Sequence, residues 1–326
     1  MTGLGESLLA AAGEEREGML ELLMELASME SPSDVPESQV PVQDRLTEAL
    51  EELGFEVEKI PGRNTGGHLF ARPEGRDPGS PSQLLLGHCD TVWKLGTLEH
   101  MPVEIEGDRL RGPGVFDMKG GLTQIIVALR ILRRLGLEPD LTPTILINSD
   151  EEIGSPESEP AIREAAKASN RVFITEPSLG LEGRVKTGRK GWGRFTLTVT
   201  GKASHAGLDP EGGVSAIEEL GHLVQALHAM TDLGRGLTVN VGVVSGGTRP
   251  NVIAAEALAE VDVRVLTGAD EKEMEARIRG LQPTLPGAGL RVDGGFLVPP
   301  LERTPRNRAL WDSAVDAAHD LGLELE

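Results

Sequence analysis

Apolar residues recur at helical spacing in two segments near the start of the chain. The first, residues 15–28, places four of them on one face: Met19, Leu22, Leu23 and Leu26. The second, residues 42–53, has the same spacing, and Gly54 follows it at a position where glycine commonly ends a helix. The pattern therefore predicts two amphipathic helices before residue 55.

Short apolar runs then alternate with helical segments as far as residue 176. We predict strands at Leu84–Leu86, Thr144–Ile147 and Arg171–Thr175, and helices at Lys119–Leu135 and Pro160–Ala168. Strands that alternate with helices are typical of a mainly parallel sheet flanked by helices. We therefore expect an α/β domain in this part of the chain.

The pattern changes near residue 187. Phe195, Leu197 and Val199 alternate with threonines, which is typical of a half-buried strand. Further strands and helices follow in the order βαββαβ, with one irregularity expected near Glu260. This order indicates an α+β unit of the ferredoxin-like kind. We place an inserted domain at residues 187–294 and the first domain at residues 1–186 and 295–326, with a returning helix from Pro305 to Leu321.

Composition narrows the classes of function. The 326 residues carry a net charge of −20, so we expect neither nucleic acid nor an anionic membrane as a partner. No apolar run approaches the roughly 18 residues of a membrane span. Cys89 is the single cysteine, which excludes an internal disulfide and fits a reducing compartment. We expect a cytoplasmic protein.

Five residues that can bind metal follow predicted strands or open a predicted helix. His88, Glu151, Glu152 and Glu176 each come after a strand, and Asp117 comes just before the helix that begins at Lys119. The carboxyl ends of parallel strands share one edge of a sheet, where ligands bind. We therefore expect these side chains to converge. Taken singly, each acid has a simpler interpretation as a solvated surface residue.

Charge balance favours two metal ions at this edge. Asp117, Glu151, Glu152 and Glu176 supply four negative charges, which would destabilise one another without compensation. Two divalent cations supply the matching positive charge. Imidazole and carboxylate ligands suit Zn²⁺, and Co²⁺ or Mn²⁺ could replace it.

Four motifs resemble those of the M20 metallopeptidase family in order and spacing. They are His88-Cys89-Asp90-Thr91-Val92, Gly114-Val115-Phe116-Asp117-Met118-Lys119-Gly120-Gly121, Asp150-Glu151-Glu152 and Glu176-Pro177. Gly188-Arg189-Lys190-Gly191 and Ala203-Ser204-His205-Ala206-Gly207 resemble the family's inserted domain, particularly in the carboxypeptidase G2-like (glutamate carboxypeptidase) branch. The resemblance implies a zinc-peptidase-like fold with an inserted dimerisation domain.

The resemblance also implies roles for single residues. His88 and Glu176 would bind one zinc, Asp117 would bridge both ions, and Glu152 would bind the second. Glu151 would be the general base and acid, and Asp90 would orient the imidazole of His88. A cis peptide bond is implied between Asp117 and Met118.

Residues of the inserted domain would complete the site. His205 resembles the family histidine that reaches the active site of the partner subunit, which implies a homodimer; its simpler interpretation is a turn histidine. Asn251 and Arg264 match polar positions that would bind the substrate's carboxylate. Arg264 has an equally weighted interpretation as a structural ion-pair partner on its strand.

These observations predict a zinc-dependent hydrolase that cleaves an amide bond of small peptides or N-acyl amino acids, of the carboxypeptidase type. Alternatives are an N-acyl amino acid deacylase or dipeptidase of the same superfamily, and a metal-poor, non-catalytic binding protein. Glu151 argues against the last, because a pure binder needs no base beside the metals.

The end of the sequence carries a separate expectation. The family takes a further histidine ligand from a Gly-rich segment near the C-terminus, and none appears before Glu326. His319 lies within a predicted helix and is interpreted as a surface residue. We therefore expect a C-terminally truncated chain that binds about one zinc or none and has little activity.

Overall fold

The structure is a computed structural model that describes residues 3–77, 79–180 and 182–326. The chain divides into two compact units, Met1–Gly183 with Ala318–Glu324, and Arg184–Ala317 with Leu325–Glu326. The division falls within the last helix, α8 (Pro305–Asp320). The domain boundaries drawn from the sequence stay a prediction. None of the helices in the described part of the chain has the length and apolar character that crossing a membrane requires.

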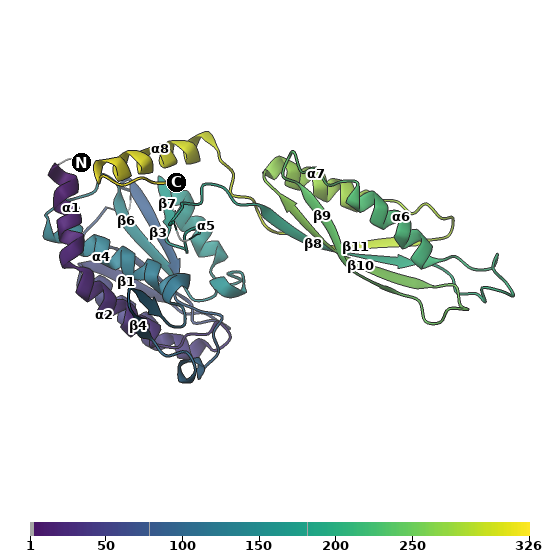
Figure 1. Ribbon diagram of the computed structural model, residues 1–326, viewed down its shortest axis with the longest axis horizontal. Coiled ribbons are helices and arrows are strands. Elements are labelled where there is room, and N and C mark those ends of the chain that lie inside the picture. The colour runs from purple at the N-terminus through teal and green to yellow at the C-terminus, as the bar shows by residue number, and fades with distance from the viewer. Residues whose placement is uncertain (1–2, 78, 181) are drawn as a thin grey trace. The chain divides into compact units, whose positions relative to one another are not determined.

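The first unit contains a five-stranded sheet in the order β1-β2-β6-β3-β7 (Figure 1). Its strands are β1 (Phe55–Ile60), β2 (His68–Pro73), β3 (Ser82–His88), β6 (Thr142–Asn148) and β7 (Arg171–Ile174). Strand β3 pairs in parallel with both β6 and β7. Strand β2 pairs antiparallel with both β1 and β6. The α/β class is confirmed, and the sheet is mixed. The short connection between β1 and β2 requires these two strands to be antiparallel, because a parallel pair needs a crossover of a dozen or more residues.

The first unit also contains helices, most of which bury apolar side chains against this sheet or against each other. They are α1 (Gly3–Glu14), α2 (Arg16–Ala27), α3 (Val40–Glu51), α4 (Gly120–Arg134) and α5 (Glu159–Ala168). Leu26 of α2, Leu46 of α3 and Ile126 of α4 share one buried cluster with Ile145 of β6. The helices predicted from apolar spacing are thus confirmed, and α1 adds one that the sequence analysis did not predict.

Short elements occupy the connections of the first unit. They are η1 (Pro36–Gln39), η2 (Thr97–Glu99), the hairpin of β4 (Glu104–Glu106) and β5 (Arg109–Arg111), η3 (Val115–Lys119) and η4 (Glu151–Ile153). Two of them, η3 and η4, carry predicted metal ligands. The connections after β3, β6 and β7 leave from the same edge of the sheet, since these three strands run parallel.

The second unit is a four-stranded antiparallel sheet in the order β11-β8-β10-β9. Its elements are β8 (Gly191–Thr200), α6 (Ala216–His228), β9 (Thr238–Gly246), β10 (Glu256–Val265), α7 (Gly268–Arg279) and β11 (Gly289–Val298). The predicted order βαββαβ is confirmed, as is the irregularity, which lies between Glu260 and Val261.

Alternation along β8 decides which face of the second sheet is buried. Phe195, Leu197 and Val199 are fully buried in the core with residues of α6 and α7. Both helices begin at a capping residue whose hydroxyl accepts a backbone hydrogen bond, Ser215 for α6 and Thr267 for α7. The predicted elements therefore form a self-contained core.

Candidate metal centre

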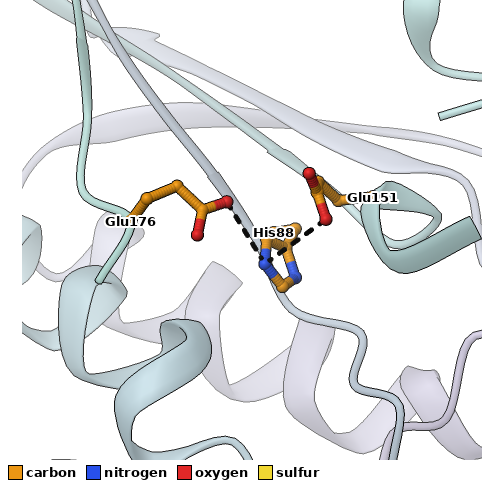
Figure 2. Close-up of side chains that lie close together, drawn as sticks. All are labelled: His88, Glu151 and Glu176. Atoms are coloured by element: carbon orange, nitrogen blue, oxygen red, sulfur yellow. Dashed lines mark ion pairs between the residues drawn. The ribbon is translucent and has the colours of Figure 1, made fainter. Parts of the chain in front are cut away.

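The five predicted metal-site residues converge in the first unit. Nε2 of His88 lies 3.1 Å from Oδ1 of Asp117, 3.5 Å from Oε1 of Glu176 and 3.9 Å from Oε2 of Glu151. Figure 2 shows both glutamates directed at the imidazole. Donor atoms within 4.8 Å of one another form two groups that share His88, one with Glu151 and Glu176 and the other with Asp117 and Glu152. Their individual roles stay a prediction.

Asp117 reaches the cluster through a sharp turn before α4. Gly114 begins the turn with a φ of 69°, and a Cβ added there would lie 2.7 Å from Cγ2 of Thr91. Glycine alone suits both the backbone conformation and the close approach. The implied cis peptide bond between Asp117 and Met118 is present. Met118 is buried, while the Asp117 side chain is half-exposed.

The imidazole of His88 is held at its other nitrogen. Nδ1 lies 3.0 Å from the backbone carbonyl of Asp90 and 3.3 Å from Oδ1 of the same residue. Nδ1 therefore faces Asp90, and Nε2 is directed at the carboxylates of Asp117, Glu151 and Glu176. Asp90 therefore stands where an orienting residue would.

The carboxylate of Asp90 also holds the loop that carries Glu151 and Glu152. Oδ1 accepts the backbone N–H of Glu151 and Oδ2 that of Glu152, each at 3.2 Å. The hydroxyl of Ser33 donates to Oδ2 at 2.6 Å. The sequence analysis did not assign Ser33 a function, and no local signal pairs residues 57 positions apart.

The far end of the same loop is fixed by Asp150 and Glu157. The buried Asp150 carboxylate accepts the backbone N–H groups of Glu157 and Ser158. The Glu157 carboxylate accepts hydrogen bonds from the backbone N–H of Arg63 and from residues 64 and 65. The N–H of Arg63 is the largest cause that holds the pKa of Glu157 near 2, well below its usual range. The turn between these anchors, η4, is thus positioned from both sides.

The electrostatics of the cluster suit divalent cations. Burial lowers the pKa of His88, but hydrogen bonds with Asp117 and Asp90 outweigh it and raise the pKa to about 11. Burial raises the pKa of Glu176 to about 7, and Asp117 and Glu151 add to that rise. Burial also raises the pKa of Glu152. Protons are retained where negative charge is crowded, and one imidazole among carboxylates is a donor set that fits zinc.

Cys89 lies between two site residues but has no place in the chemistry. Its side chain is fully buried, and burial raises the pKa of the thiol to about 12. A thiol in that state is not a nucleophile near neutral pH. Cys89 is therefore a packed side chain of the core.

Three predicted site residues belong to the second unit. Nδ1 of His205 accepts the backbone N–H groups of Gly207 and Leu208, so Nε2 carries the hydrogen of the neutral ring. The backbone carbonyl of Asn251 accepts the N–H of Ala206, which places Asn251 beside this turn.

The third of these residues, Arg264, pairs with Asp262 through two hydrogen bonds and lies over the ring of Trp192. These contacts give weight to its interpretation as an ion-pair partner. The roles of His205, Asn251 and Arg264 stay predictions.

Two histidines occupy other places in the fold. His319 is exposed on α8, as expected. His68 is buried in β2, an interior strand that pairs with both β1 and β6. Strand order depends on pairing between distant segments, so the local sequence does not indicate this position.

Residues 187–283 match the family model described as a peptidase dimerisation domain. The chain is 33% identical to carboxypeptidase G2 from Pseudomonas sp. (strain RS-16), with 97% of this chain and 78% of that protein covered. It is 27% identical to acetylornithine deacetylase from Myxococcus xanthus, with 81% of this chain and 71% of that protein covered. A probable carboxypeptidase of Emericella nidulans is 31% identical, and the chain spans 60% of its length.

Two solved structures have a similar fold. Aminopeptidase PepT from Bacillus cereus superposes with a TM-score of 0.76 at 21% identity, with 95% of this chain and 83% of that chain covered. A dinuclear metal-binding peptidase of the M20 family from Bacillus subtilis superposes with a TM-score of 0.63 at 18% identity, with 95% of this chain and 81% of that chain covered.

Proposed function

The chain belongs to the M20 peptidase family of hydrolases, and from this premise we propose that it cleaves the amide bond of small peptides or N-acyl amino acids as a carboxypeptidase. The observation that carries the proposal is the convergence of His88, Asp117 and three glutamates around a space in which their donor atoms can share metal ions.

We propose two zinc ions for the complete centre, which includes the further histidine ligand that the family resemblance implies. His88 and Glu176 would hold one, Glu152 the other, and Asp117 would bridge them; Co²⁺ or Mn²⁺ suits the same donors. When bound, zinc would supply a Lewis acid that acidifies water and polarises the scissile carbonyl. The close grouping of the donor atoms of His88, Asp117, Glu152 and Glu176 supports a metal centre here. The two groups share His88, and the assignment of the bridge to Asp117 comes from the family resemblance.

Glu151 is the proposed general base and acid. It takes a proton from the attacking water and returns it to the leaving amine, so one carboxylate serves both steps. Its side chain is 43% exposed, so a substrate can reach it. Its backbone N–H is fixed by Asp90, so the carboxylate starts from a defined place.

A homodimer built through the second unit would complete the site. His205 from the partner subunit would donate Nε2–H to the oxyanion that forms at the carbonyl. The match to a dimerisation domain supports this arrangement. So does the exposed edge strand β9, where Val243 and Val244 are 51% and 60% exposed, because an unpaired edge readily pairs with a second copy.

Arg264 and Asn251 are the proposed contacts for the substrate's free carboxylate. An N-acyl amino acid deacylase is the second candidate, favoured by the relationship to acetylornithine deacetylase. We also propose a cytoplasmic location, supported by the single buried cysteine.

A metal-dependent hydrolysis assay tests the function. In a complete enzyme, with the further histidine ligand present, metal depletion should abolish turnover of dipeptides and N-acyl amino acids, and Zn²⁺, Co²⁺ or Mn²⁺ should restore it. Glu151→Gln should keep its metal and lose roughly 10²–10⁴-fold in kcat. Glu159→Gln, at an exposed position on α5, is the matched control. Nearly full turnover by Glu151→Gln would show that the base is elsewhere.

A further inference from the structure

The first turn of α4 lies directly against the backbone that leads into Glu176. The helix opens with Gly120 and Gly121, immediately after the Asp117 turn, and Gly121 is buried. Glycine is a poor helix former, so a pair in one turn indicates a local constraint. A Cβ added to Gly121 would overlap the backbone oxygen of Thr175 and lie 2.8 Å from its Oγ1. Only a residue without a side chain fits at this contact.

The same turn of α4 also rests on the strand that carries His88. The backbone N–H of His88 donates to Sδ of Met118 at 3.2 Å. A Cβ added to Gly87 would lie 2.7 Å from Cδ2 of Leu122 and 2.9 Å from Cε of Met118. Met118 and Leu122 are both buried. The start of α4 therefore contacts the chain at the ends of both β3 and β7.

Pairing within the sheet holds the Thr175 side of the contact. Leu86 of β3 pairs with Ile174 of β7, and the N–H of Thr175 donates to the carbonyl of Leu86 at 3.4 Å. The hydroxyl of Thr175 is buried and has no hydrogen-bond partner in the described part of the chain. A buried hydroxyl without a partner lowers stability, so the close packing is retained despite a cost. The backbone at Thr175 is therefore fixed by β3 on one side and by α4 on the other.

A methyl group at position 121 would exceed the tolerance of a metal site. Relief of its overlap with Thr175 requires a shift of about 1 Å or more. Ligand distances in metal sites hold to within about 0.2 Å. Oε1 of Glu176 lies 3.5 Å from Nε2 of His88, and its carboxylate is directed at the imidazole (Figure 2). A shift of this size on either side of the contact would therefore separate Glu176 from the ligands held by α4 and β3.

We propose that Gly121 is a positioning residue of the metal centre, because the absence of a side chain there sets the distance of Glu176 from His88. The proposal rests on the proposed function, since it concerns the same centre, and it adds a residue that supplies no metal-binding atom. Gly87 has the matching part on the β3 side. The two glycines act through the placement of the first turn of α4, which begins directly after Asp117.

The zinc affinity of the full chain, measured by competition with a chelator, tests the proposal. Gly121→Ala should lower this affinity roughly 10–100-fold, as the loss of a positioning contact typically does. Glu176→Ala removes the ligand itself. The double variant should lose little more than Glu176→Ala alone, because both changes remove the same bond. Additive losses, or an unchanged affinity in Gly121→Ala, would overturn the proposal.

A matched control and a milder variant accompany this test. Gly18→Ala lies in the first turn of α2, where the added Cβ has no atom within 4 Å, and it should bind zinc like the wild type. Should Gly121→Ala fail to fold, Gly87→Ala replaces it, because the atoms that its methyl group meets are the ends of flexible side chains. Gly87→Ala should lower zinc affinity by less than Glu176→Ala does, and an unchanged affinity would count against the proposal.

Crystal structures of the wild type and of Gly121→Ala give a second readout that needs no metal. The distance of 3.5 Å between Nε2 of His88 and Oε1 of Glu176 should increase by about 1 Å in the variant. An unchanged distance would reject the positioning role. If the wild type binds no zinc, the proposed centre fails, and this distance still decides the role of Gly121.

Discussion

The carboxylate of Asp90 accepts a hydrogen bond from the backbone N–H of Glu151, at 3.2 Å. The same buried side chain lies 3.3 Å from Nδ1 of His88. One carboxylate thus connects a proposed metal ligand with the proposed base. This link makes the geometry of the two interdependent, and it leads to the first prediction.

Asp90→Asn should lower the affinity of the centre for metal. Asparagine has one acceptor oxygen, so it cannot accept the N–H groups of both Glu151 and Glu152 while facing His88. Loss of such an orienting partner typically costs about 10–100-fold in metal affinity. Competition with a zinc chelator measures it. Asp44→Asn, an exposed residue paired with Lys59, is the control and should bind metal normally. Unchanged affinity in Asp90→Asn would rule out the orienting role.

His205→Ala and Glu151→Gln should complement each other. If His205 acts in the partner's site, a mixed dimer contains one site with both groups intact. Mixing the two inactive variants should therefore restore up to about a quarter of wild-type activity, since random exchange makes half of the dimers mixed and each has one working site of two. The recovery should appear with the time course of subunit exchange, followed by fluorescence energy transfer. No recovery despite complete exchange would place His205 outside the reaction.

Arg264→Ala separates the two interpretations of that arginine. If it binds the substrate's carboxylate, KM should rise roughly 10-fold or more for free-carboxylate substrates and far less for their amides, because a charge-assisted hydrogen bond is lost. If it serves only as the ion-pair partner of Asp262, both substrate types should change equally. Asp262→Asn is the companion variant, since it removes the pair and keeps the guanidinium.

Glu157→Gln should reveal a pH-dependent contribution to stability. The pKa of Glu157 is held near 2 in the folded protein, below the ordinary value of 4.5, chiefly by the backbone N–H of Arg63. A lowered pKa contributes stability that is present above about pH 4.5 and is lost as the pH falls toward 2. The Tm of the variant should therefore be lower by a few degrees at pH 7, and the gap to wild type should close between pH 4.5 and 2.

Differential scanning calorimetry across that range measures the two Tm values. Glu164→Gln, an exposed glutamate on α5, is the control and should track the wild type. A Tm gap that stays constant down to pH 2 would show that the Glu157 carboxylate is not responsible.

The sequence by itself determined the features that depend on neighbouring residues. Apolar spacing located α4 and the alternating strand β8, because helical and strand periods are local properties. It also placed His88, Glu151, Glu152 and Glu176 after strands, and parallel strands bring such residues to one edge. The motif spacing then indicated the family, which the comparison with carboxypeptidase G2 confirmed.

Only the tertiary structure decided which distant segments meet. The pairing of Ser33 with Asp90, the hold of Glu157 on residues 63–65 and the interior place of β2 join segments whose separation leaves no periodic signal. Exposure was decided in the same way. Trp93 and Phe116 are large aromatic residues, yet both are exposed. Whether such a residue is buried depends on whether another segment packs over it, and no local pattern specifies that.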